Sequence, residues 1–139
     1  MNEPPELIEK LRQWVEKAEE DYTVARHLLG APEVAAFGVI CFHAQQCAEK
    51  YLKALLTLQD VTFPKTHSLR LLLELLPPGT NAGGQPQEIV PLSGYGAEFR
   101  YPADGERVTE EEAKNAVAVA AKVREAARAQ LPAGALTQG

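Results

Sequence analysis

The sequence predicts an all-α protein, an up-and-down bundle of four to five helices. Three observations lead to this fold class. Apolar residues recur at steps of three and four along most of the chain, which is the period of an amphipathic helix. Clusters of proline and glycine separate these segments, as they do between consecutive helices. No segment convincingly shows the alternation of apolar and polar residues that is typical of a strand.

The first expected helix runs from Pro5 to about Leu29 and presents one apolar face. Pro4 and Pro5 suit its first turn, where the backbone N–H groups have no partner inside the helix. Gly30, followed by Pro32, suits its end, because glycine tolerates a left-handed cap and proline cannot continue the helix.

A second helix is expected from about Glu33 to Leu58, with a broad apolar face. Because the link between the two helices is so short, they must pack antiparallel as a hairpin. Gly38, Ala44 and Ala48 are small enough to let another helix approach closely.

Shorter elements are expected after the hairpin. Thr66 is a plausible N-cap for a short helix through Leu76, and the sequence Pro-Pro-Gly from position 77 ends it. Residues 77–87 are rich in glycine and proline and are typical of a surface loop. A further helix is expected over 88–101, with Pro91 in its first turn.

The last helix has a clear start, because Thr109 and Glu112 have the spacing of a capping box. Its inner face consists mostly of alanine and valine, which predicts close packing against the hairpin. We expect one domain over residues 1–131 and a frayed, flexible tail over 132–139.

Composition and charge restrict the function. The net charge of −5 argues against a broad, nonspecific nucleic-acid surface. The region 43–76 is the one stretch where basic residues and histidines gather. No apolar run approaches the roughly 18 residues that span a bilayer, and the acidic start does not resemble a secretory signal, so we expect no membrane association and a cytoplasmic location.

Neither a disulfide nor a metal or cofactor site is expected. Cys41 and Cys47 are six residues apart, which places them on different faces of a helix, so both are interpreted as small buried apolar residues. His27, His43 and His67 fall on different helices or faces, without acidic residues at ligand spacing. The pair Gly83-Gly84 lacks the strand and the lysine of a phosphate-binding loop.

Candidate binding residues line the second helix. His43, Gln46, Lys50 and Lys53 follow one another at steps of three, four and three, so they form one polar stripe. Such a stripe lines a groove or an interface, or it is simply a solvated face. Gln45 and Glu49 lie on another edge, where the plainer interpretation is an interhelical hydrogen-bonding pair.

A second group of candidates surrounds Arg100. Its forked guanidinium suits a phosphate, and Tyr101, with Tyr95 and Phe99, offers rings for stacking on a base. His67 is a further candidate donor, although a histidine in this position more often braces the start of a helix. Arg100 also has a purely structural interpretation, as the ion-pair partner of Asp104 or another carboxylate, with the rings in the core.

Three segments together resemble the HEPN family (higher eukaryote and prokaryote nucleotide-binding). They are residues 43–56, residues 66–69 (Thr-His-Ser-Leu), and residues 99–102 (Phe-Arg-Tyr-Pro) with Asp104. The resemblance covers about residues 7–128. It implies a helical bundle, usually a homodimer, that is often encoded beside a minimal nucleotidyltransferase.

Many HEPN proteins are metal-independent ribonucleases whose signature is an arginine, four to six residues, and a histidine. Arg100 fits the arginine, but no histidine follows His67 in this chain. An imidazole is the natural proton-transfer group near neutral pH. Asp104 and Glu106 are poor substitutes, because a carboxylate beside a phosphodiester is electrostatically unfavourable unless its pKa is raised.

Three functions therefore remain open. The favoured one is a noncatalytic module that binds a nucleotide or a partner nucleotidyltransferase in a two-component system similar to a toxin and antitoxin. The second is a ribonuclease toxin with an irregular active site, in which Arg100 meets His43 or His67 across a dimer interface. The third is a dimeric scaffold for protein interactions.

Overall fold

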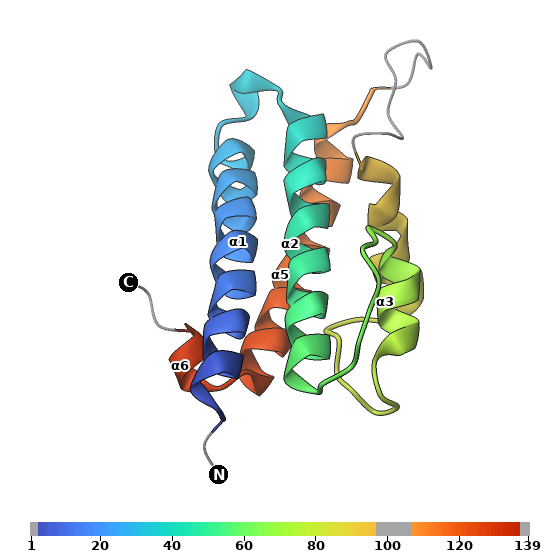
Figure 1. Cartoon of the computed structure of the whole chain (residues 1–139). Helices are drawn as coiled ribbons and strands as arrows, with labels where there is room; N and C mark the ends of the chain where they lie inside the picture. The colour runs from blue at the N-terminus through green and yellow to red at the C-terminus, as the bar shows by residue number, and fades with distance from the viewer. Residues whose placement is uncertain (1–2, 97–106, 137–139) are drawn as a thin grey trace.

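The architecture was determined from a computed structural model that describes residues 3–96 and 107–136. Helix α1 (Pro5–Leu29) and helix α2 (Phe37–Leu58) lie side by side and antiparallel, as the hairpin prediction requires (Figure 1). Helix α5 (Glu110–Gln130) packs against both of them, behind the hairpin in this view. The described residues form helices and connecting segments without any strand, so the all-α prediction is confirmed.

The link between α1 and α2 differs from the prediction. Gly30 has a φ of −77°, so it ends α1 without the expected left-handed cap. The segment Pro32–Val34 forms a short 3-10 helix, η1, and Ala35 takes the left-handed conformation with a φ of 56°. Because this turn interrupts the helical backbone, α2 begins at Phe37 and not near Glu33.

Helix α2 is the centre of the bundle. It packs against α1, against α5 and against the short helices on its third side, so most of its side chains are buried. Ala44, Cys47 and Ala48 are fully buried, and so are the alanines at 113, 116, 120 and 127 of α5. The small side chains on both helices allow the close packing that the alanine-rich sequence predicts.

The segment between α2 and α5 covers one side of α2. Helix α3 (Leu69–Leu75) is capped by Ser68, whose Oγ accepts a hydrogen bond from Leu71 N at 3.1 Å. Thr66, the predicted cap, instead accepts a hydrogen bond from the backbone N–H of Ser68.

The helix predicted over 88–101 is replaced, within the described residues, by two short elements. These are α4 (Pro86–Ile89) and the 3-10 helix η2 (Val90–Tyr95). Pro91 removes a backbone donor and Gly94 lowers helix propensity, which explains why no regular α-helix forms through this stretch. Ile89 and Leu92 nevertheless anchor it in the core.

The prediction for the start of α5 is correct, whereas the structure after its end differs from the prediction. Thr109 and Glu112 form the predicted capping box, in which each side chain bonds the other residue's backbone N–H at 3.1 Å. After α5, the chain continues as helix α6 (Ala133–Leu136) beside the start of α1 (Figure 1), where the sequence predicts a frayed tail. Leu131 and Ala135 are buried there, and burial of these apolar side chains stabilises the extra turn.

None of the helices within residues 3–96 and 107–136 is both long enough and apolar enough to cross a bilayer.

Candidate functional site

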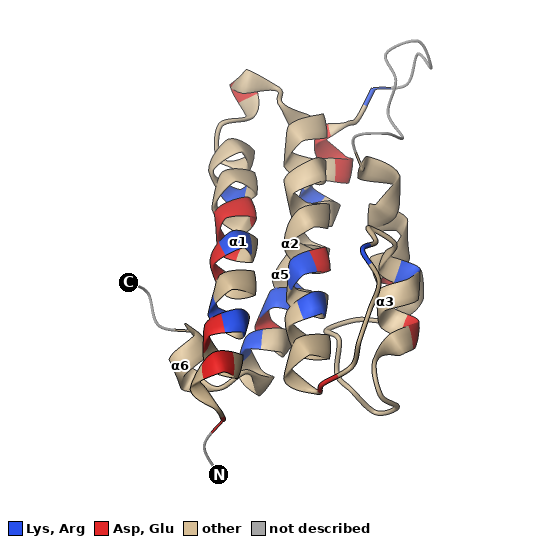
Figure 2. Ribbon diagram, in the orientation of Figure 1, with Lys and Arg blue, Asp and Glu red and all other residues tan. Residues whose placement is uncertain are grey.

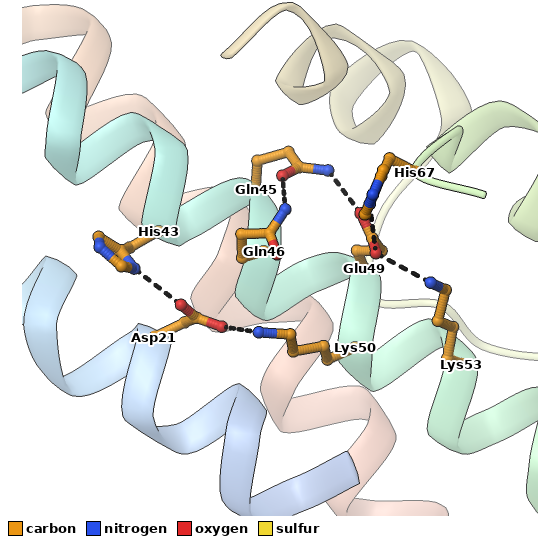
Figure 3. Close-up of polar contacts among 8 residues, drawn as sticks. All are labelled: Asp21, His43, Gln45, Gln46, Glu49, Lys50, Lys53 and His67. Atoms are coloured by element: carbon orange, nitrogen blue, oxygen red, sulfur yellow. Dashed lines mark hydrogen bonds and ion pairs between the residues drawn. The ribbon is translucent and has the colours of Figure 1, made fainter. Parts of the chain in front are cut away.

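The polar stripe of α2 runs along the partly buried middle of this helix. Residues 37–48 of α2 carry no lysine, arginine or carboxylate, and its charged residues begin at Glu49 (Figure 2). The stripe does not face solvent freely. Its members divide into two groups, each gathered around one buried carboxylate, and the two groups are shown in Figure 3.

The first group, called here the Asp21 cluster, consists of Asp21, His43 and Lys50. Asp21 belongs to α1, and its side chain is only 10% exposed. Its Oδ1 lies 2.7 Å from His43 Nδ1, and its Oδ2 accepts a hydrogen bond from Lys50 Nζ at 2.5 Å. A carboxylate only accepts hydrogen bonds, so His43 Nδ1 carries the proton in this contact. In the neutral ring, His43 Nε2 is then left as an acceptor.

The second group, the Glu49 cluster, consists of Glu49, Gln45, Lys53 and His67. Gln45 Nε2 and Lys53 Nζ donate to the two oxygens of Glu49 at 2.9 and 3.0 Å. His67 Nδ1 lies 3.0 Å from both of these oxygens. The Glu49 side chain is 2% exposed, so these donors are what makes burial of its charge tolerable.

Gln46 extends the Glu49 cluster. Its Nε2 donates to Gln45 Oε1 at 2.6 Å, and Gln45 in turn donates to Glu49 (Figure 3). The predicted hydrogen-bonding role of Gln45 and Glu49 is therefore correct. However, the two residues bond each other along α2, and it is His67 that brings in a second segment of the chain.

The predicted residues thus fall into three sets. His43 and Lys50 meet at Asp21, while Gln46, Lys53 and His67 meet at or beside Glu49. The position of His67 fits its expected bracing role, because it lies just before the N-cap of α3. The predicted candidates Arg100, Tyr101 and Asp104, and the neighbouring Phe99, lie outside the described residues.

Tyr95 is described, and its hydroxyl donates to Glu112 Oε2 at 2.8 Å. This ring therefore links η2 to the first turn of α5.

Asp21 is the site residue that sequence reasoning missed. It follows Val15 and Ala18 on the inner face of α1 and precedes the buried Ala25. An acidic residue at an otherwise apolar position of a helix requires a buried partner. The acidic residue at position 21 of the apolar face was therefore the sequence feature that could have identified this site residue.

A third polar group is centred on Glu19 and connects the three long helices. Glu19 of α1 accepts two hydrogen bonds from Arg124 and one from Tyr51, while Arg128 donates to the Tyr51 hydroxyl at 3.2 Å. Burial raises the pKa of Tyr51, and the hydrogen bond to Glu19 raises it further. A hydroxyl that is so reluctant to ionise is not an activated nucleophile, so this group joins helices.

The cysteines have the predicted environment. Cys41 and Cys47 are not joined in a disulfide, and both are fully buried. Burial raises the pKa of the Cys47 thiol, which disfavours the reactive thiolate. Over the described part of the chain, no group of three or more His, Cys, Asp or Glu side chains is arranged to hold a metal ion.

The chain is similar to a known protein family over most of its length. The sequence model described as the HEPN domain matches residues 11–130, which is most of the chain. The protein belongs to the HEPN family. The resemblance that the sequence segments indicate is confirmed, and with it the HEPN-like fold.

Two solved structures are similar to this HEPN protein over nearly their full length. TT1696 from Thermus thermophilus is 28% identical, with a TM-score of 0.70, over 88% of this chain and 98% of that one. ST0689, described as an archaeal HEPN homologue, is 27% identical, with a TM-score of 0.67, over 86% of this chain and 96% of that one. No curated protein sequence matches the chain.

Proposed function

We propose that this chain is a noncatalytic HEPN module that binds a nucleotide, a partner minimal nucleotidyltransferase, or both, in a two-component system similar to a toxin and antitoxin. The observation that carries the proposal is the gathering of two lysines and two imidazoles along one edge of α2. His43 and Lys50 are held at Asp21, and Lys53 and His67 are held at Glu49.

This arrangement suits anion binding for an electrostatic reason. In each cluster one lysine balances the one carboxylate, so protonation of the histidine leaves a net positive charge. The carboxylates also fix the positions of the ammonium and imidazole groups, which lowers the entropy lost when a phosphate binds. Arg100, four residues after the last described residue of its segment, would add the forked donor that phosphate favours.

The sequence does not supply the residues that catalysis in this family requires. The family's ribonuclease signature places a histidine four to six residues after the arginine, and positions 104–107 of this chain are Asp, Gly, Glu and Arg. No histidine occurs anywhere after His67. Without an imidazole at this position, the reaction lacks the group that transfers a proton near neutral pH.

One contact favours the ribonuclease as a second candidate. His43 Nδ1 lies 2.7 Å from Asp21 Oδ1, and a carboxylate in this position orients an imidazole and stabilises its protonated form. A general base in a hydrolytic site needs both effects. His43 would then replace the missing histidine, with Arg100 supplied by the same chain or by the partner of a dimer.

Calorimetric titration tests the proposal. The full chain is titrated with ATP, GTP, AMP and a short single-stranded RNA, and the RNA is recovered and examined on a gel. We expect saturable binding that Arg100→Ala abolishes while the free energy of unfolding stays within about 1 kcal/mol of wild type. Lys114→Ala, which removes an exposed lysine of α5, is the matched control and should bind normally.

The other outcomes are equally informative. RNA that is cleaved by the wild type and spared by His43→Gln would overturn the noncatalytic proposal in favour of the ribonuclease. A large loss of stability in Arg100→Ala would assign that residue to a structural ion pair. If no nucleotide or RNA binds, copurification with the product of a neighbouring nucleotidyltransferase gene decides between the two-component module and a plain scaffold.

HEPN domains often form dimers, and we propose that this one is a homodimer. Sedimentation of the purified chain tests this directly, since a monomer at micromolar concentration would contradict it.

A further inference from the structure

A pocket of about 400 Å³ lies beside the Glu49 cluster, and none of its described lining residues belongs to either polar cluster. It is formed by one face of α1, the last turn of α2 and the segment that follows α2. Its volume is within the range of known ligand sites, about 300–1,000 Å³. Its lining residues are Lys10, Gln13, Trp14, Lys17, Thr57 and Phe63.

The wall of the pocket is aromatic. The Trp14 and Phe63 rings pack together with centroids 6.2 Å apart and planes inclined by 50°. Lys53 Nζ lies 5.6 Å from the centroid of the Trp14 ring. Rings inclined in this way do not form a parallel-walled slot for a flat nucleobase. They form a concave apolar surface that suits a bulky side chain.

The rim of the pocket is positively charged. Lys10 and Lys17 lie four residues before and three residues after Trp14, so all three share one face of α1. Neither lysine forms an ion pair or a side-chain hydrogen bond with any described residue, whereas Arg12 on a neighbouring face is paired with Glu9. None of the described side chains that line the pocket is a carboxylate.

This positive charge stands out in a chain whose overall net charge is −5. The adjacent hollow, which shares Lys10 and Thr57, contains the carboxylates of Glu6 and Asp60. An acidic ligand is therefore attracted to the Trp14 pocket and repelled from the hollow beside it. Lys10 and Lys17 are two helical turns apart, about 10 Å, which an extended peptide spans in about three residues.

We infer that the Trp14 pocket is a docking site for an acidic peptide segment of another protein, in which a bulky apolar side chain lies between carboxylates. The apolar side chain fills the concave wall of Trp14 and Phe63, and the carboxylates on either side of it pair with Lys10 and Lys17. The lining of this site contains no residue of the Asp21 or Glu49 cluster. Because Lys53 of the Glu49 cluster contacts the Trp14 ring, variants of Lys10 and Lys17 are the ones that test this site apart from the proposed nucleotide site.

Trp14 is the only tryptophan in the chain, so its fluorescence reports directly on the pocket. The probe is the peptide acetyl-Glu-Glu-Phe-Glu-Glu-amide, titrated into the full-length protein. Two further peptides serve as controls, one with alanine in place of phenylalanine and one with lysine in place of glutamate. We expect a saturable change in Trp14 emission with the probe alone, weakened by added salt because the paired charges are exposed.

The double variant Lys10→Glu/Lys17→Glu replaces two attractions with two repulsions, and we expect it to raise the Kd of the probe by about tenfold or more. Both positions are exposed, so the variant should fold. Lys122→Glu, a reversal at an exposed lysine of α5, is the matched control and should leave the Kd unchanged.

Three results would overturn the inference. The first is the absence of any saturable change with the probe, and the second is equal binding of the alanine peptide. The third is tighter binding of AMP than of the probe with the same dependence on Lys10 and Lys17, which would make the pocket a nucleotide site.

Discussion

Arg124 donates two hydrogen bonds to Glu19, from Nε to Oε2 at 2.7 Å and from Nη2 to Oε1 at 2.9 Å. The guanidinium also lies over the ring of Tyr22, 4.6 Å from its centroid. Because Tyr51 of α2 donates to the same carboxylate, one side chain of α1 is bonded to both α2 and α5. Glu19 is thus the polar point at which the three long helices meet.

Removal of this charge should destabilise the bundle. Glu19→Gln leaves the guanidinium of Arg124 without its charged partner in a partly buried position, so we expect a loss of about 2 kcal/mol in the free energy of unfolding. Urea denaturation measures this loss. The control is Glu9→Gln, which breaks the exposed pair with Arg12 and should cost less than about 0.5 kcal/mol. Equal losses in the two variants would contradict the assigned role.

The same carboxylate predicts a dependence of stability on pH. Burial raises the pKa of Glu19, but hydrogen bonds from Arg124 and Tyr51 outweigh this effect, and the pKa lies below its ordinary value. The unfolded chain therefore takes up this proton at a higher pH than the folded chain does. The contribution of Glu19 to stability is complete above the ordinary pKa of about 4.3 and is lost as the pH falls through the lower folded value.

The measurement for this prediction compares wild type with Glu19→Gln across the acidic range. We expect the difference in free energy of unfolding to be largest at neutral pH and to shrink below about pH 4. A difference that stays constant down to the acid transition would show that Glu19 acts without its charge.

The loop before α4 approaches α5 too closely for a side chain. Gly83 has a φ of +91°, and a Cβ built there lies 2.3 Å from the carbonyl oxygen of Lys122. We expect Gly83→Ala to lower the free energy of unfolding by about 3 kcal/mol, from the backbone conformation and the clash together. Gly79 has a φ of +88° with open space around it, so Gly79→Ala should cost about 1 kcal/mol. The difference in free energy of unfolding between Gly83→Ala and Gly79→Ala, measured by thermal or urea unfolding, gives the effect of the clash alone.

The thiols should be unreactive in the folded protein. Cys41 and Cys47 are fully buried, and burial raises the pKa of the Cys47 thiol, so little thiolate is available to react. A colorimetric thiol reagent should titrate neither residue under native conditions and both in urea. Rapid reaction of either cysteine in the native protein would mean that α2 opens readily.

The long helices could be predicted from the sequence because each one buries a periodic apolar face and has clear end signals. Pro5 begins α1, and the capping box of Thr109 begins α5, as expected. The start of α2 was predicted too early, since the 3-10 turn at Pro32–Val34 and the left-handed Ala35 leave no mark in the apolar period. Leu131 and Ala135 are buried by tertiary packing, and the local sequence does not indicate this packing.

The candidate site was only partly predictable for a related reason. The spacing of His43, Gln46, Lys50 and Lys53 correctly places them along one side of α2. Spacing within one helix says nothing about the neighbouring helix, so the division of these residues between Asp21 and Glu49 was not foreseen. The pocket at Trp14 was missed because its wall joins residues of α1 to Phe63, almost fifty positions later in the chain.

The contact between Glu19 and Arg124 spans 105 positions of sequence, and it therefore has a consequence for synthesis on the ribosome. Helices α1 and α2 leave the exit tunnel first and can pair with each other, because the link between them is short. Their shared inner face, including Ala44, Cys47 and Ala48, stays open to solvent until α5 has been translated. During that interval the nascent hairpin exposes apolar surface, and the carboxylate of Glu19 lacks its partner Arg124. The hairpin therefore avoids association with other chains only if α5 is translated and packs promptly.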